Sequence, residues 1–132
     1  MSAVMKIALA ASVSFALIAC GPRTVLQPDG GPSPFTCTVE LVSMTVQVVD
    51  AAGAPVEGAT VTATNLGTQK TVTAQTNASG VTTAVTEDLG QGTASLTATF
   101  GGRVSTLKNV TWTCGQCHCN PDPGVVTLTL SP

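Results

Sequence analysis

Short stretches of alternating apolar and polar residues run through residues 35–132, and this period of two predicts β-strands rather than helices. Threonine and valine are frequent in these stretches, and β-branched residues favour the pleated backbone of a strand. Glycine, proline, asparagine and aspartate recur between them and mark turns. The predicted strands lie within residues 37–48, 59–64, 70–76, 81–86, 93–100, 103–113 and 125–130.

The first of these stretches changes its alternation halfway along. Apolar residues occupy odd-numbered positions in residues 37–41 and even-numbered positions in residues 44–48. A shift of one residue turns every side chain to the opposite face, so the strand should bulge or bend at residues 42–43 and pass from one sheet to another. Strands and turns at this spacing predict an all-β fold, a seven-stranded two-sheet antiparallel sandwich.

An apolar run from Ile7 to Ala19 precedes the predicted sandwich. It is long enough for the hydrophobic region of a signal peptide and shorter than the ~20 residues that a membrane-spanning helix needs. The run ends in Leu17-Ile18-Ala19-Cys20, which resembles the lipobox of bacterial lipoproteins. The resemblance implies a signal peptide at residues 1–19 and lipidation of Cys20. An ordinary secretory signal with an incidental cysteine, or a spanning helix, are the alternative interpretations.

Residues 20–34 are expected to form the lipidated cysteine and a flexible linker, because they hold prolines, a Gly-Gly pair and few apolar side chains. Several acyl chains on Cys20 would anchor the chain stably, since each buried methylene contributes about 0.8 kcal/mol. In Gram-negative lipoproteins, Asp after the lipidated cysteine is associated with retention in the inner membrane. Here Gly21 follows, so the resemblance implies an exported protein anchored in the outer membrane.

Composition narrows the classes of function. The 132 residues include 5 Lys or Arg and 7 Asp or Glu, and the formal net charge is −2. These charges are few and scattered, so neither nucleic acid nor anionic lipid headgroups are expected partners. Tyrosine is absent and aromatic residues make up 3% of the chain, which argues against a stacking platform for sugars. With one histidine and no phosphate-binding glycine loop, we expect no enzyme and no cofactor.

One stretch is similar to a known family. Residues 45–61 combine a strand ending in Asp50 with a Gly-x-Pro-Val-x-Gly-Ala-x-Val pattern, and they resemble the opening hairpin of carboxypeptidase regulatory-like domains. The later turn at residues 76–80 resembles the second signature of that family. The resemblance implies a transthyretin-like or Ig-like sandwich over residues 35–132. It implies little about activity, because such modules are attached to many unrelated proteins. The pattern departs at Val81, where Tyr or Phe is common.

Four cysteines remain after Cys20, namely Cys37, Cys114, Cys117 and Cys119. In an exported domain with a thin core of valine and alanine, they are best interpreted as two disulfides. A bridge between Cys117 and Cys119 would close a very small and strained ring, which disfavours the scheme that needs it. Cys37 is therefore expected to pair with Cys117 or with Cys119, and Cys114 with the one that remains.

The same cysteine segment allows other chemistry. Cys114, Cys117, His118 and Cys119 are soft ligands for zinc or copper, but adjacent His118 and Cys119 rarely reach one tetrahedral ion, and exported thiols oxidise. The Cys-x-x-Cys spacing is also that of thioredoxin-type redox pairs, which need a helix N-terminus to lower the thiol pKa. The pattern here predicts no such helix. We therefore expect no resident metal and no redox function.

These observations favour a non-catalytic, lipid-anchored module for protein interaction, adhesion or envelope structure, with an unidentified envelope protein as its partner. Threonine-rich edge strands suit contact by strand addition. The alternative is a binder of carbohydrate or metal that uses the loop end carrying Cys114 and Cys119, and a third hypothesis is an accessory subunit of an enzyme. Glu87, Asp88 and Asp122 could form a weak calcium site, although acidic loop residues are usually only solvated.

Overall fold

The structure is a computed structural model that describes residues 36–132. The predictions for the signal peptide at residues 1–19, lipidation at Cys20 and the linker at residues 20–34 therefore lie outside the described residues. Within the described part, strands dominate and the only helical element is a single 3₁₀ turn, η1 (Glu87–Leu89). No helix in this part is long and apolar enough to cross a membrane.

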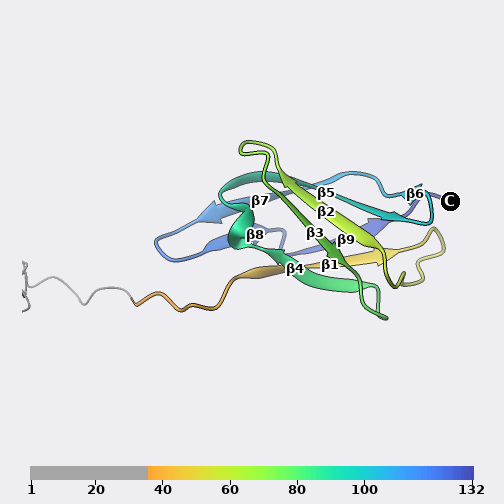
Figure 1. Cartoon of the computed structure of the whole chain (residues 1–132), viewed down its shortest axis with the longest axis horizontal. Coiled ribbons are helices and arrows are strands. Elements are labelled where there is room, and N and C mark those ends of the chain that lie inside the picture. The colour runs from red at the N-terminus through yellow and green to blue at the C-terminus, as the bar shows by residue number, and fades with distance from the viewer. Residues whose placement is uncertain (1–35) are drawn as a thin grey trace, which may run out of the picture. The chain divides into compact units, whose positions relative to one another are not determined.

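Nine strands are found among residues 36–132 (Figure 1). They are β1 (Ser43–Val49), β2 (Thr60–Asn65), β3 (Thr71–Gln75), β4 (Val81–Thr86), β5 (Gly92–Phe100), β6 (Arg103–Val104), β7 (Lys108–Cys114), β8 (Cys119–Asp122) and β9 (Val125–Thr129). The smaller sheet has the order β4-β1-β9, and the larger sheet has the order β3-β2-β5-β7-β8, with β6 paired to β5.

The two sheets pack as a sandwich, so the predicted all-β sandwich is confirmed. Two details differ from the expected seven antiparallel strands. The predicted strand at residues 103–113 is divided into β6 and β7, and the cysteine segment contributes β8. The last strand, β9, pairs with β1 in parallel, while β1 and β4 are antiparallel. The parallel pairing arises because the chain passes from β8 in the larger sheet to the smaller sheet, where β9 lies beside β1 on the side away from β4. Alternation along the sequence does not reveal this crossing.

Residues 36–42 do not form a strand, although the alternation predicted one from residue 37. Val39 is fully exposed and Leu41 is about half exposed, at 52%. The change of parity at residues 42–43 marks the beginning of β1 rather than a bend within a longer strand. A register irregularity does occur slightly later, between Met44 and Val46 in the pairing with β4. The segment before β1 is held by side chains, as described below, and not by a ladder of backbone bonds.

The predicted inner positions of β1 are confirmed, because Met44, Val46 and Val48 are fully buried. Phe100, which alternation places on one face with Leu96 and Ala98, is 38% exposed. The buried core holds one apolar residue at every second position of the central strands, and each fully buried valine or leucine contributes about 1.5–3 kcal/mol. Trp112 is the largest fully buried side chain. The core comprises Met44, Val46, Val48, Val56, Ala59, Val61, Ala63, Val85, Leu89, Ala94, Leu96, Ala98, Val110, Trp112, Val126, Leu128 and Leu130.

The turn between β3 and β4 packs against the turn after β1. Gly80 has a φ of 71°, and a Cβ built on it would lie 2.7 Å from the carbonyl oxygen of Val48. Only glycine tolerates both that backbone conformation and so close an approach. Thr76, at the start of this turn, donates its hydroxyl to the carbonyl of Val56 (2.6 Å) and accepts the N–H of Ala59 (2.9 Å). These contacts give a structural reason for the Thr and Gly of the second signature.

Candidate functional site

The cysteines lie at one end of the sandwich, where residue 36 enters and the hairpin of β7 and β8 turns (Figure 1). Cys37 is bonded to Cys117, with a Cα–Cα distance of 5.3 Å and a sequence separation of 80. Cys114 is bonded to Cys119, with a Cα–Cα distance of 3.8 Å, directly across the hairpin. Of the two arrangements that the sequence left open, the structure has this one.

Glu87 lies at the same end of the sandwich, and its carboxylate accepts hydrogen bonds from two separate segments. Its Oε1 accepts the N–H of Val42 (2.9 Å), just before β1, and its Oε2 accepts the N–H of Cys119 (2.7 Å) in β8. The side chain of Glu87 is only 10% exposed. Because η1 begins directly after β4, the first residue of this turn is placed between the entering segment and the cysteine hairpin.

These hydrogen bonds keep Glu87 ionised. The N–H of Val42 has the largest effect, followed by the N–H of Cys119 and by His118, and together they lower the pKa of Glu87 from 4.5 to about 2. Partial burial of the carboxyl acts in the opposite direction and is outweighed. A carboxylate with two backbone donors is therefore charged throughout the physiological range.

His118 connects the same carboxylate to the entering segment. Its Nδ1 lies 2.9 Å from Oε1 of Glu87, and its Nε2 lies 3.0 Å from the hydroxyl oxygen of Thr38. The side chain of His118 is 24% exposed. The sequence had indicated no catalytic set around the single histidine, yet the fold places a hydroxyl, an imidazole and a carboxylate in a row. The carboxylate also carries two backbone N–H groups, so the row primarily fastens Thr38 and Val42 to the domain.

We name this arrangement the cysteine clasp: the two disulfides together with the hydrogen bonds of Glu87, His118 and Thr38. The cysteines and His118 were recognisable in the sequence, whereas Glu87 was expected there only as a weak calcium ligand. Among residues 36–132, no three His, Cys, Asp or Glu side chains are grouped to hold a metal ion. Asp88 is exposed and Asp122 lies within β8, so the three acids do not converge.

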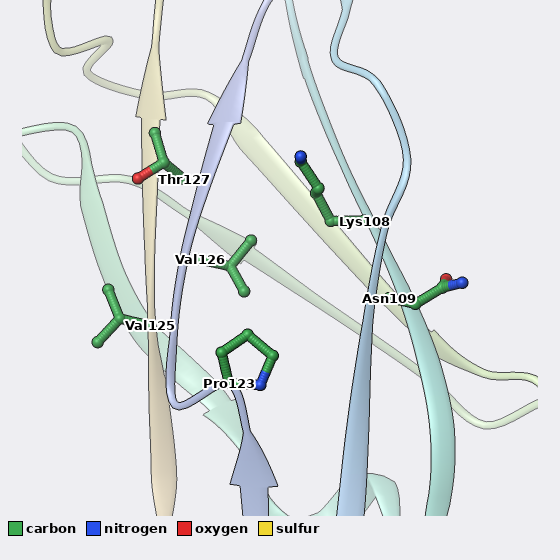
Figure 2. Close-up of a pocket in the computed structure, with 6 residues that line it drawn as sticks. All are labelled: Lys108, Asn109, Pro123, Val125, Val126 and Thr127. Carbon is green, nitrogen blue, oxygen red and sulfur yellow. The ribbon is translucent and has the colours of Figure 1, made fainter.

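A second feature is a small groove between β7 and β9, with a volume of about 230 Å³. Lys108, Pro123 and Val126 point toward one another across it, whereas Asn109 points away (Figure 2). Val125 and Thr127 line the groove from β9, and their side chains lie on the far side of that strand. The groove therefore has an apolar floor, one cation and a wall of strand backbone.

The backbone of β9 is free where it borders this groove. The bonds from Thr45 N–H to the carbonyl of Gly124 and from Leu130 N–H to the carbonyl of Val49 turn the even-numbered residues of β9 toward β1. Odd-numbered residues turn the other way, and β9 is the last strand of its sheet. Within residues 36–132, the N–H and C=O of Val125 and Thr127 have no strand partner.

The same edge is closed farther along. Ser105 and Leu130 form an isolated antiparallel bridge, and Ser131 donates its N–H to the carbonyl of Val104 (3.1 Å). The free part of the edge is therefore short and coincides with the groove. Edge strands suited to strand addition were expected from the sequence, but neither the edge of β9 nor the groove beside it could be singled out there.

The comparison with family models supports the domain assignment. The model of the carboxypeptidase regulatory-like domain matches residues 43–130, which spans β1 to the end of the described strands. No curated protein matches the chain.

Proposed function

This chain belongs to the carboxypeptidase regulatory-like domain family, and from that premise we propose that it is a lipid-anchored envelope module that acts by protein interaction. The family is non-catalytic, so the sandwich is expected to present a surface rather than to transform a substrate. Such modules work as attachments, and the relevant properties are how the domain is held and which surface it offers.

The cysteine clasp is the observation that carries this proposal. The linker from Cys20 leads into residues 36–42, and this segment is fastened to the sandwich at three points: Cys37, Thr38 and Val42. A pull on a membrane anchor would reach the covalent Cys37–Cys117 bond before it reached the hydrogen bonds of β1. Reinforcement at that point is what a domain held by its N-terminal side requires.

The location rests on the sequence at the other end of the linker. Leu17-Ile18-Ala19-Cys20 resembles a lipobox, and Gly21 favours the outer membrane over the inner one. Two disulfides fit an oxidising compartment such as the periplasm or the cell surface. Together these features support export followed by lipid anchoring.

A protein partner is favoured over a small ligand. The groove of about 230 Å³ is smaller than the ~300–1,000 Å³ of typical small-molecule sites. The cysteines considered above as metal ligands are joined in disulfides, and thiolates rather than disulfides are the ligands that zinc and copper prefer.

Membrane fractionation of the full-length protein tests the anchoring. We expect Cys20→Ala to move the protein from the membrane fraction to the soluble periplasm or the medium, because the acyl chains are lost. Gly21→Asp is the matched control, since it keeps Cys20 and should leave the protein in a membrane fraction while shifting it toward the inner membrane. Recovery of Cys20→Ala in membranes at the wild-type level, or the absence of acyl mass on wild-type Cys20, would contradict the proposal.

A further inference from the structure

The larger sheet has a charged residue on its inner face. Lys108 of β7 pairs with Leu96 of β5, and paired residues on adjacent strands point to the same side of a sheet. Leu96 is fully buried and so are the next inner positions of β7, Val110 and Trp112, but Lys108 is exposed. A lysine therefore stands where the alternation calls for a core residue.

The position of Lys108 follows from the unequal widths of the sheets. The smaller sheet ends at β9, while the larger one continues through β7 to β8. Lys108 points into the space between β7 and β9 (Figure 2). A further strand of the smaller sheet would lie in this space, because β9 is the last strand of that sheet. Within residues 36–132 the ammonium group of Lys108 forms no ion pair.

Three kinds of group without a partner among residues 36–132 therefore line the same groove. The backbone of β9 offers the N–H and C=O groups of Val125 and Thr127, the groove floor offers Val126 and Pro123, and Lys108 offers a positive charge. A peptide backbone is the ligand that satisfies alternating N–H and C=O groups along an edge strand. A groove of about 230 Å³ is smaller than typical small-molecule sites and matches the size of one or two side chains.

We propose that the groove between β7 and β9 binds an extended segment of a partner protein, which pairs with β9 and places a carboxylate on Lys108. This inference rests on the proposed function in protein interaction and names the surface and the kind of partner. The segment combines an acidic residue for Lys108 with a neighbouring apolar residue that packs on Val126 and Pro123.

Charge favours a different chain over a second copy of this one. Symmetric pairing of two copies would join β9 to β9, and its sequence, Val-Val-Thr-Leu-Thr, holds no acid to meet Lys108. The usual protective lysine of an exposed edge stands on the edge strand itself. Lys108 instead lies on β7 of the other sheet, where it pairs with Leu96 of β5, and the pairing of β7 with β8 begins only at Thr111.

A random nonapeptide library, panned against the full-length protein purified in detergent, tests the proposal. We expect enriched peptides to carry an Asp or Glu flanked by β-branched or apolar residues. Thr127→Pro removes an N–H that faces the groove and is tolerated at an edge. It should weaken these peptides about tenfold, the loss expected for one hydrogen bond and a blocked approach.

Matched variants distinguish a specific role of the β9 edge in peptide binding from a general effect of proline or of charge. Thr73→Pro makes the same change on the edge strand β3, where the bonds from Asn65 N–H to Lys70 and from Thr76 N–H to Ala59 turn the even-numbered residues inward. It should leave peptide binding unchanged. Lys108→Glu should reverse the preference, so that a second panning enriches Lys or Arg in place of the acid. Circular dichroism and melting curves verify that each variant is folded.

Several outcomes would overturn the proposal. They are a library without enrichment, enriched peptides that bind Thr127→Pro as tightly as the wild type, or an unchanged preference in Lys108→Glu. If the wild-type protein is a dimer that Thr127→Pro dissociates, and no peptide is enriched, the occupant is a second copy. If Lys108→Ala increases self-association without peptide binding, the lysine only guards the edge.

The same experiments distinguish this inference from the proposed function. Lipid anchoring is measured by fractionation and acyl mass, neither of which depends on β9. Cross-linking of the full-length protein in intact cells gives the remaining comparison. If a partner is cross-linked equally to the wild type and to Thr127→Pro, the proposed function in protein interaction stands, but β9 is not the surface that binds the partner.

Discussion

The cysteine clasp and the edge of β9 differ in how their backbone groups are bonded within one small sandwich. At the clasp, a segment without regular structure is held by a disulfide, a histidine and a carboxylate that accepts two backbone N–H groups. At β9, regular structure stops with backbone groups unused and a lysine facing the gap. The difference shows that one end of the sandwich is fastened by side chains and disulfides, whereas the edge of β9 keeps unpaired backbone groups. In the proposed function, the first holds the domain to its anchor and the second binds a partner.

The largest expected effect comes from cutting the clasp. Replacing Cys37 and Cys117 together by alanine opens a loop with a sequence separation of 80, and loop-closure entropy predicts a loss of about 4–5 kcal/mol. Each kcal/mol shifts the melting temperature of a domain of this size by roughly 4–8 °C, so the melting temperature should fall by well over 10 °C. Calorimetry of the full-length protein measures the shift.

The second disulfide provides the matched comparison. Cys114 and Cys119 are separated by only 5 residues, so replacing both by alanine should cost about 2 kcal/mol by the same entropy argument. Alkylation without reduction, followed by mass spectrometry, should show no free thiol in the wild type. A smaller loss for the long bridge than for the short one would contradict the role assigned to the entering segment.

An intermediate effect is expected from Glu87→Gln, and it depends on pH. A carboxyl whose folded pKa lies below its unfolded value stabilises the folded state above the unfolded pKa and loses that contribution as the pH falls through the folded pKa. For Glu87 the window therefore extends from about pH 4.5 down to about pH 2. In this window the free energy of unfolding should fall more steeply with decreasing pH in the wild type than in Glu87→Gln. The slope should correspond to the uptake of up to one more proton on unfolding in the wild type.

Urea unfolding at several pH values between 2 and 6 measures that slope. Glu57→Gln, the same substitution at an exposed turn residue, is the control. Equal slopes for Glu87→Gln and the wild type would show that the carboxylate does not fasten the clasp.

The smallest effect on stability is expected at the open edge. Thr127→Pro removes no hydrogen bond of the β1–β9 ladder, and Lys108→Ala removes a charge without an ion pair among residues 36–132. Each should change the free energy of unfolding by about 0.5 kcal/mol or less, as surface substitutions usually do. A loss of several kcal/mol in urea unfolding would mean that these residues support the fold, and the contrast with the clasp would disappear.

Much of the fold was predictable because its signal is local. Alternation with a period of two and a high content of β-branched residues specify strands, and the inner positions of residues 44–48 and 93–98 follow from that parity. The same reasoning failed for residues 36–42, where Val39 alternates like a core residue but is exposed. Parity reports which side a residue faces, and it cannot report whether a second sheet covers that side.

The cysteines, the two sheets and the family resemblance were evident in the order of the residues. Which thiols pair, and that Glu87, His118 and Thr38 meet, depended on three segments far apart in the chain coming together. The open edge of β9 was likewise not visible in the sequence, because it results from a three-stranded sheet packing against a six-stranded one. Local patterns specify elements through side-chain periodicity, but the groups left unpaired at an edge are determined only when the elements are packed.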